Sequence, residues 1–217
     1  MTATLTPPAE ERDEALVLHL GWKMSGDEFY DFCMRHEDLS LELTSEGDLV
    51  IVPPTGGETG RRNFELAVMF GSWVKRDGTG IGFDSSSMFS LPNGAMRSPD
   101  LCWIKKERWR ALSEKEREKF SPICPDFVLE LRSPSDALKR LQKKMEEYIA
   151  NGAQLGWLLD PSTRRVYVYR PGAKTEVLED PETVSGEPLL RGFTLHVRAV
   201  WESPDSEPDT PDSREGQ

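Results

Sequence analysis

One stretch of the sequence decides the fold: Pro125-Asp126-Phe127-Val128-Leu129-Glu130-Leu131-Arg132-Ser133-Pro134-Ser135-Asp136. It is an apolar, strand-like run that carries an acid and a base two positions apart and stops at Ser-Pro-Ser-Asp. Because alternate side chains of a strand share a face, we expect Glu130 and Arg132 to project together, with Phe127, Leu129 and Leu131 on the other face. A charged pair in an apolar strand is costly unless it is paired, bound to a metal or at the end of the sheet, so this pair marks a candidate site.

The residues after this strand predict a crossover to a second buried strand. Residues 135–151 have the spacing of an amphipathic helix, and Gly152 stands where a C-terminal glycine cap belongs. The next apolar run, 155–159, is closed by Asp160-Pro161. Strand, helix and strand in this order predict a βαβ unit with a right-handed connection.

Further strands and helices surround this unit. Ser25 and Glu28 have the spacing of a capping box, which predicts a helix to about residue 36. A longer helix is expected at about 60–75, where apolar spacing is shown by Phe64, Ala67, Val68, Gly71 and Val74. The other expected elements are a helix at 113–120, a hairpin of strands 39–43 and 48–52, and strands at 80–83, 87–91, 100–104, 165–170, 175–178 and 195–200. This order predicts a single α/β domain with a mixed central sheet flanked by helices.

The two ends of the chain differ from the rest in composition. Residues 1–14 and 202–217 are rich in proline and acids and are expected to be disordered, which leaves 15–201 as the folded domain. The formal net charge is −11, and about eight of the net negative charges lie in these ends. This charge argues against broad nonspecific binding to nucleic acid, although the core itself is only mildly acidic.

Composition also bears on location and on metal class. No apolar run approaches the roughly 20 residues that span a bilayer, and the N-terminal residues lack the pattern of a signal peptide. We therefore expect a cytoplasmic protein without membrane contact. The three cysteines and three histidines show no ligand spacing, which argues against a zinc site.

Three acidic residues stand on or beside predicted strands. Glu42 alternates with leucines, Asp100 follows Ser-Pro and opens an apolar strand, and Glu130 lies in the stretch quoted above. Carboxylates that converge from strand ends suit hard divalent cations and metal-assisted phosphodiester hydrolysis. Each residue alone has an ordinary explanation, a solvated edge position or a strand start, so the hypothesis rests on the combination.

The helix expected at 135–151 adds a basic residue. On a helical wheel its apolar face is formed by Leu138, Leu141, Met145, Tyr148 and Ile149. Lys144 falls at the rim of that face, whereas Lys143 lies nearly opposite, in water. Lys144 is therefore the lysine that reaches toward the site, although a lysine that snorkels along a helix flank fits the wheel equally well.

These residues resemble the PD-(D/E)xK nuclease superfamily and, within it, the Uma-type (Uma two) branch of endonucleases. The resemblance covers about 39–170 and rests on residues 53–60, on the strand stretch, and on two motifs, Leu91-Pro92-Asn93-Gly94-Ala95-x-Arg97-Ser98-Pro99-Asp100 and Lys144-x3-Tyr148-x3-Gly152-x4-Trp157-Leu158-Leu159-Asp160-Pro161. It implies a restriction-endonuclease-like fold and DNA hydrolysis that depends on Mg²⁺, with Mn²⁺ as a substitute. It further implies that Asp100 and Glu130 are metal ligands and that Glu42 is a supporting acid.

The chain departs from the superfamily at one position, where Arg132 replaces lysine. A guanidinium stays protonated, so Arg132 is interpreted as a clamp for phosphate or water, and Lys144 as the source of the amine. Tyr148, one turn further, either braces the lysine, contacts phosphate or simply packs. Asp126 gives a second Pro-Asp pair, but Asp100 is preferred because an adjacent strand converges better with Glu130.

The leading hypothesis is a Mg²⁺-dependent endonuclease that cuts double-stranded DNA and acts as a homodimer, because cutting both strands takes two sites. A second hypothesis is a catalytically silent binding or regulatory protein that retains the fold, which the acidity and Arg132 favour. A third is a nuclease for RNA or single strands, which these residues do not separate from the first.

Overall fold

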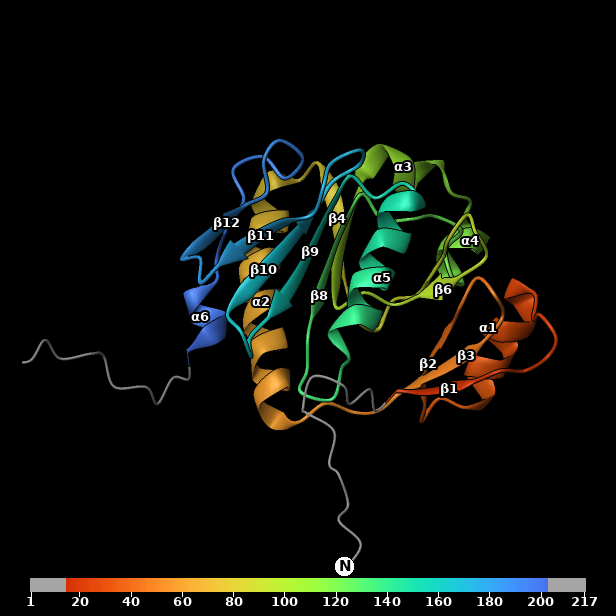
Figure 1. Ribbon diagram of the computed structural model, residues 1–217. Coiled ribbons are helices and arrows are strands. Elements are labelled where there is room, and N and C mark those ends of the chain that lie inside the picture. Colours follow the sequence, from red (N-terminus) through yellow and green to blue (C-terminus); the bar gives the residue numbers. More distant parts are fainter. Residues whose placement is uncertain (1–14, 203–217) are drawn as a thin grey trace, which may run out of the picture.

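The computed structural model describes residues 15–202, shown in Figure 1. The ends that the sequence predicts to be disordered, 1–14 and 202–217, lie outside the described residues except for Glu202. The described part contains a six-stranded main sheet, a five-stranded small sheet and a two-stranded ribbon. Within it, every helix is too short or too polar to span a bilayer.

The main sheet is built around the strand quoted at the outset. Its strand order is β11 (Glu176–Glu179), β10 (Arg165–Tyr169), β9 (Leu155–Asp160), β8 (Phe127–Leu131), β7 (Leu101–Lys105) and β4 (Gly80–Asp84). β8 and β9 are parallel, and the other neighbours are antiparallel. The helix α5 (Leu138–Ala150) connects β8 to β9, so the predicted βαβ unit is confirmed.

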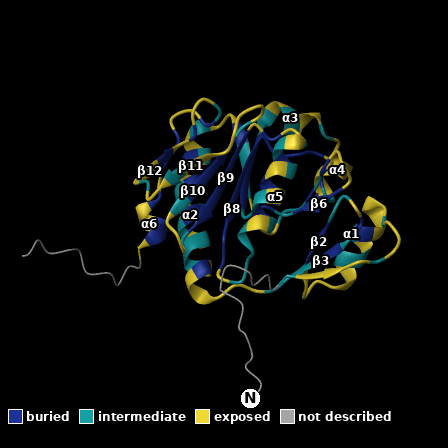
Figure 2. Cartoon of the chain, in the orientation of Figure 1, coloured by how far each residue is buried: buried dark blue, intermediate teal, exposed yellow. Residues whose placement is uncertain are grey.

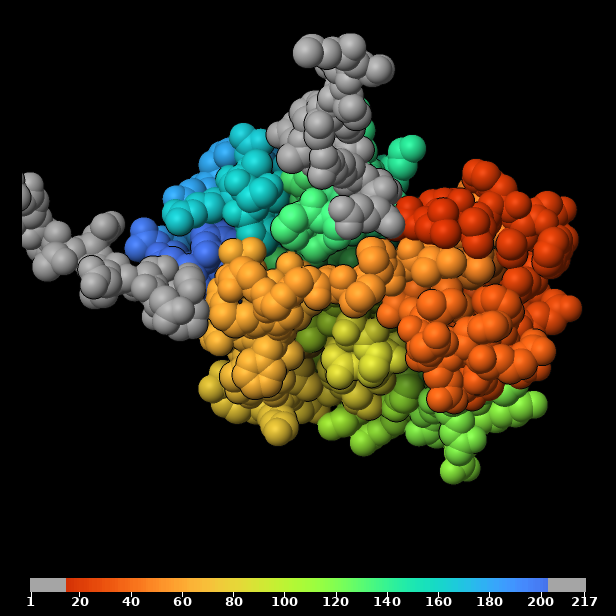
Figure 3. Space-filling view, turned by 90° about the horizontal axis from the view of Figure 1, so that it is seen from below, coloured from red at the N-terminus to blue at the C-terminus, as the bar shows by residue number. Residues whose placement is uncertain are grey.

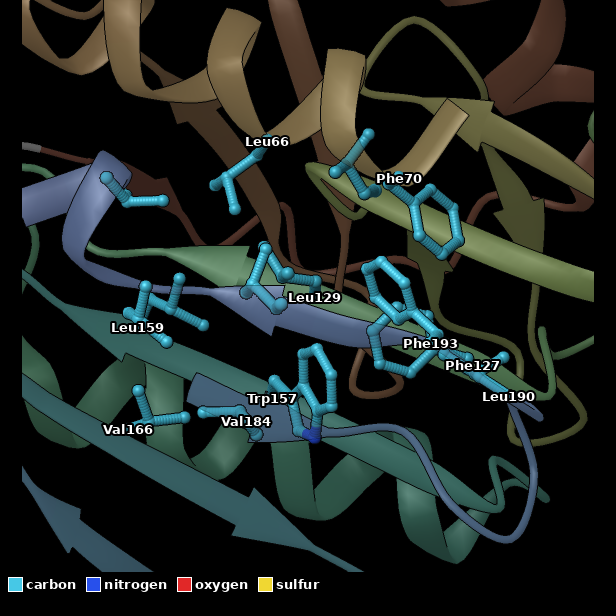
Figure 4. Close-up of a cluster of buried hydrophobic side chains, with 14 of the residues drawn as sticks. Leu66, Phe70, Phe127, Leu129, Trp157, Leu159, Val166, Val184, Leu190 and Phe193 are labelled. Carbon is cyan, nitrogen blue, oxygen red and sulfur yellow. The ribbon is translucent and has the colours of Figure 1, made fainter. Parts of the chain in front are cut away.

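Two helices cover opposite faces of the main sheet. Phe127, Leu129 and Leu131 of β8 pack into a cluster with α2 (Gly57–Asp77), part of which is drawn in Figure 4. Val128 of β8 packs into a separate cluster with α5. Because alternate side chains point to opposite faces, Glu130 falls on the α5 side. The central strands β8 and β9 are buried throughout, as Figure 2 shows.

The small sheet lies beside the main sheet and carries its own apolar cluster. Its strand order is β1 (Leu16–Leu18), β3 (Leu49–Val52), β2 (Ser40–Leu43), β6 (Met96–Arg97) and β5 (Phe89–Ser90). The predicted hairpin is confirmed, with Leu43 opposite Leu49. Helix α1 (Gly26–Arg35) begins with the predicted capping box and inserts Phe29 into the cluster.

The predicted apolar face of the long helix is right only in part, since Ala67 and Val74 pack against the core but Phe64 and Val68 do not. Phe64 is 71% exposed and Val68 48%, whereas the buried side chains are Leu66, Phe70 and Trp73. Apolar residues occur on both sides of this helix, so spacing alone did not select a face. The structure buries the face with the two large aromatic rings, which remove more apolar area from water.

The C-terminal part of the domain also differs from the expectation. A strand was predicted at 195–200, but the described chain forms β12 (Thr183–Ser185), β13 (Thr194–His196) and the short helix α6 (Arg198–Trp201). The chain changes from strand to helix at Val197, which has helical backbone angles, and it thereby buries Val200 and Trp201. The predicted helix at 113–120 is confirmed in part, as α4 (Glu114–Glu118), which follows the unpredicted α3 (Lys106–Ala111).

The packing of β4 on β7 yields a test of the fold. A Cβ added at Gly80 would overlap the buried indole of Trp103, whereas one added at Gly71, in the middle of α2, would meet nothing. We predict that Gly80→Ala lowers the free energy of unfolding by about 1–3 kcal/mol. Gly71→Ala is the matched control and should raise it by about 0.5–1 kcal/mol, since alanine favours a helix interior. Urea unfolding of the two variants checks both signs, and equal shifts would contradict the packing.

Candidate functional site

A pocket of about 550 Å³ opens where the C-terminal end of β8 meets the small sheet. Its lining includes Glu42 of β2, Ser98 and Asp100 just before β7, Glu130 of β8 and Lys144 of α5. Figure 1 shows the lower end of β8 and the start of α5 on one side, with β2 and β3 on the other. Figure 3 looks at this end from below, where the segment between β3 and α2 (orange) crosses between the two sheets.

Lys144 lies at the centre of the charged groups. Its Nζ is 2.8 Å from Oε1 of Glu42 and 2.8 Å from Oε1 of Glu130. The hydroxyl of Tyr148 donates to the same oxygen of Glu130, at 3.2 Å. Lys143 is exposed, so the wheel correctly separated the inward lysine from the outward one. A buried ammonium between two buried carboxylates is paired on both sides, which offsets part of the cost of burying its charge.

Asp100 is fixed to the end of β8. Its Oδ2 accepts a hydrogen bond of 2.7 Å from the backbone N–H of Leu131. The strand that follows Asp100 runs antiparallel to β8, with Leu101 opposite Leu129, and this pairing brings Asp100 and Glu130 to one pocket. Convergence from adjacent strands is the arrangement that the sequence argument preferred.

The alternative acid, Asp126, lies at the other end of β8. Its Oδ2 accepts from the backbone N–H of Lys105, at 2.9 Å, and pairs with Arg108, at 3.0 Å. It is not among the residues that line the pocket. The structure thus gathers Asp100 rather than Asp126 with Glu130.

The three acids of the pocket are electrostatically distinct. Burial raises the pKa of Glu130 to about 8, because the charge of Lys144 only partly offsets burial and the neighbouring carboxylates. Burial likewise raises the pKa of Asp100 to about 6, despite its hydrogen bond from Leu131. For Glu42 burial is outweighed by the charges of Lys144 and Arg97, which lower its pKa to about 2. Glu42 is therefore ionised at neutral pH, whereas Glu130 largely keeps its proton there and Asp100 titrates below it.

The donor set fits a divalent cation only in part. Among residues 15–202, no three His, Cys, Asp or Glu side chains are grouped so that they could hold a metal ion. The oxygens of Glu42 are taken by Lys144, by the backbone N–H of Ser98 and by Arg97. The three-acid set expected from the sequence is thus not preformed. Asp100 and Glu130 remain, and one or two carboxylates together with water and phosphate are the usual ligands of Mg²⁺.

Arg132 does not join the pocket. Its Nη1 binds Oδ2 of the fully buried Asp160 at 2.9 Å and Oγ of Ser162 at 3.2 Å, and its Nε donates to the carbonyl of Asp136 at 3.1 Å. The alternation rule placed it beside Glu130, but β8 ends at Leu131, so the rule does not reach it. A buried carboxylate at the end of β9 takes the guanidinium instead. Arg132 ties the β8–α5 connection to the turn after β9.

The structure adds two residues that the sequence argument did not single out. Arg97 is 9% exposed and binds Glu42 through Nη1, at 3.2 Å, and Glu147 through Nε, at 2.6 Å. Arg97 belongs to the motif that precedes Asp100, and Glu147 lies one turn after Lys144 on α5. The closeness of Arg97 to Asp100 and of Glu147 to Lys144 in the sequence was the signal for these two residues. Their pairing could not be predicted, because it joins residues 50 positions apart.

The raised pKa of Glu130 predicts a pH dependence of stability. The folded state holds the proton of Glu130 up to about pH 8, whereas an unfolded glutamate releases it near pH 4.3. Stability from this group is therefore present at low pH and is lost as pH rises through that window. We predict that the wild-type free energy of unfolding falls more steeply from pH 5 to 8 than that of Glu130→Gln, when both are measured by urea unfolding in EDTA. Parallel profiles would show that Glu130 ionises normally.

Comparison with solved structures places the fold. A crystal structure described as a putative nuclease belonging to DUF820, from Anabaena variabilis, matches with a TM-score of 0.66 and 22% identity, over 82% of this chain and 97% of that chain. The expected restriction-endonuclease-like α/β fold is confirmed by this likeness. No curated protein sequence matches the chain.

The family model of Uma2, described as a putative restriction endonuclease, matches residues 27–198. That description supports a nuclease function in general terms. The match also contains every residue of the pocket discussed above, from Glu42 to Lys144. Since it spans well over half of the sequence, the chain belongs to the Uma2 family.

Proposed function

We propose that this chain is a cytoplasmic, metal-dependent endonuclease that hydrolyses DNA phosphodiester bonds. One observation carries the proposal: a single pocket gathers Asp100, which precedes β7, Glu130 of β8 and Lys144 of α5, in a chain of the Uma2 family. Two acids and an amine in one pocket are the groups that metal-assisted phosphodiester hydrolysis needs.

Asp100 and Glu130 are the residues proposed to hold Mg²⁺, or Mn²⁺ in its place. The bound ion would supply a Lewis acid and a water of lowered pKa. Both carboxyls must be deprotonated to bind it, and their raised pKa values of about 6 and about 8 mean that metal affinity increases with pH across this range. The backbone N–H of Leu131 orients Asp100, and the Tyr148 hydroxyl orients Glu130.

Lys144 is proposed to act as a cation rather than a base. Its two carboxylate partners outweigh burial and raise its pKa, so the amine keeps its proton. An ammonium aimed into the pocket stabilises the charge that develops on the phosphate oxygens and orients the attacking water. Arg132 has no part in this scheme, because its guanidinium is bound at Asp160.

The direct test is cleavage of a supercoiled plasmid with Mg²⁺ or Mn²⁺. We predict that wild type nicks the plasmid and that Asp100→Asn, Glu130→Gln and Lys144→Met each reduce the rate on the order of a hundredfold or more. Lys143→Met is the matched control, because the neighbouring lysine is exposed, and it should cut at the wild-type rate. EDTA should abolish cutting. Equal residual cutting in wild type and all variants would refute the catalytic proposal.

Duplex cleavage predicts an assembly of two chains. Each described chain carries one such pocket, so cutting both strands in one encounter requires two copies. We predict that the enzyme converts plasmid directly to linear product. Light scattering of the same sample should then give a mass of twice 24.6 kDa. A monomer that yields only nicked circles would contradict the homodimer. Single-stranded DNA and RNA, offered in the same assay, identify the nucleic acid that is cut.

A specific observation also supports a second candidate, a catalytically silent protein that binds nucleic acid or protein. Lys144 stands between Glu42 and Glu130, and its ammonium group takes the place of a metal cation between the two carboxylates. If this ion pair is never released, the fold persists without metal. Calorimetry with Mn²⁺ separates the two candidates, since the silent protein binds no metal and cleaves none of the three nucleic acids.

A further inference from the structure

A line of alternating acidic and basic side chains runs from the flank of α5 into the pocket. It starts at Glu147, whose Oε2 is 2.6 Å from Nε of Arg97. Arg97 binds Glu42 at 3.2 Å, and Glu42 binds Lys144 at 2.8 Å. Lys144 in turn binds Glu130, also at 2.8 Å. Each side chain in the line is thus bonded to the next, and acidic and basic side chains alternate.

Both oxygens of Glu42 already accept hydrogen bonds from neighbouring groups. Its Oε1 accepts from Lys144 and from the backbone N–H of Ser98, and its Oε2 accepts from Arg97. The side chain is 4% exposed. A carboxylate offers about four lone pairs, and three of those of Glu42 already face donors, which leaves one on Oε2 for a hard cation.

Resting on the proposed function, we propose that Arg97 is a positioning residue that, together with Glu147, holds Glu42 as the anchor of Lys144. Glu42 then serves the amine, and Asp100 and Glu130 serve the metal. The contacts along the line fix the position of Lys144. The backbone N–H of Ser98 and the side chain of Arg97 hold Glu42 against β6, and Glu42 holds Lys144 in the pocket. Glu147 is also fixed by Asn93, whose Nδ2 donates to its Oε1 at 2.9 Å.

The electrostatics favour this division of work. Arg97 cannot lose its proton, and its charge, together with that of Lys144, favours the anionic form of Glu42. Without Arg97, Glu42 would share one cation with Glu130, and Lys144 would have two equal partners. With Arg97 in place, Glu42 is the stronger partner of Lys144. Lys144 therefore keeps its position when Glu130 binds the metal ion. The anchor therefore sets where the amine points during the reaction.

The test compares turnover with metal affinity. We expect Arg97→Met and Glu42→Gln each to lower kcat on the order of a hundredfold, because the amine is misplaced. Their Kd for Mn²⁺, measured by calorimetry, should stay within about twofold of wild type, whereas loss of a partner behind a true metal ligand weakens binding by roughly 10–100-fold. Glu130→Gln should lose Mn²⁺ binding. Arg97→Lys should recover part of the lost turnover.

Further variants guard against a purely structural effect. Arg97 is buried, so Arg97→Met also weakens the fold, and its melting temperature is recorded with its activity. Glu147→Gln keeps the arginine and its bond to Glu42, and should give a smaller loss of kcat. Arg165→Met removes an arginine that pairs with Glu179 at the exposed β10–β11 edge, and it should leave kcat unchanged. The double variant of Arg97 and Glu42 should lose no more than the worse single variant, since both act on one amine.

A spectroscopic arm decides the inference independently of catalysis. The Nζ–H signal of Lys144 should be observable by NMR in wild type and Arg97→Lys, because the buried ion pairs protect it from exchange with water. It should disappear in Arg97→Met and Glu42→Gln. If the wild type is inactive, the proposed function is refuted, but the NMR signal still tests whether Arg97 and Glu42 anchor Lys144. Multiplying losses in the double variant, a signal unaffected by Arg97→Met, or weaker Mn²⁺ binding in Glu42→Gln would each overturn the inference.

Discussion

One buried ammonium joins the three parts of this molecule. Lys144 stands on α5, and its two partners belong to the small sheet, through Glu42, and to the main sheet, through Glu130. A buried charge is tolerated only where it is fully paired, so these parts must meet at the pocket for the lysine to be stable. The pairing of Lys144 therefore both forms the pocket and helps to hold the small sheet against the main sheet.

The two glutamates on this lysine are chemically unlike. Glu42 has a second cation behind it and a backbone donor, and it stays ionised. Glu130 faces burial, another acid and a shared lysine, so it holds its proton more readily. Two residues of the same type therefore differ because of their surroundings, which is how one pocket provides both a constant anchor and an exchangeable ligand.

The sequence predicts those parts in which local pattern and tertiary burial agree. The unit of β8, α5 and β9 was predictable because its apolar runs are short and bounded by turn residues, and Lys144 because a helical wheel separates it from Lys143. The buried face of α2 was not, since apolar residues such as Phe64 occupy both sides. The Arg97–Glu147 pair joins distant positions, and the place of Arg132 depends on where β8 ends, so neither is visible in local sequence.

The placement of the amine on a helix has a consequence for how this site varies. In a strand, the spacing between a lysine and a neighbouring carboxylate is set by backbone geometry. Here it is set by how closely α5 lies on the sheet, and that separation depends on Met145, which is fully buried and packs over Gly156, a position without a side chain. Core residues that never touch a ligand can therefore tune the reach of Lys144, so the reactivity of the pocket can drift through packing while its charged residues stay the same.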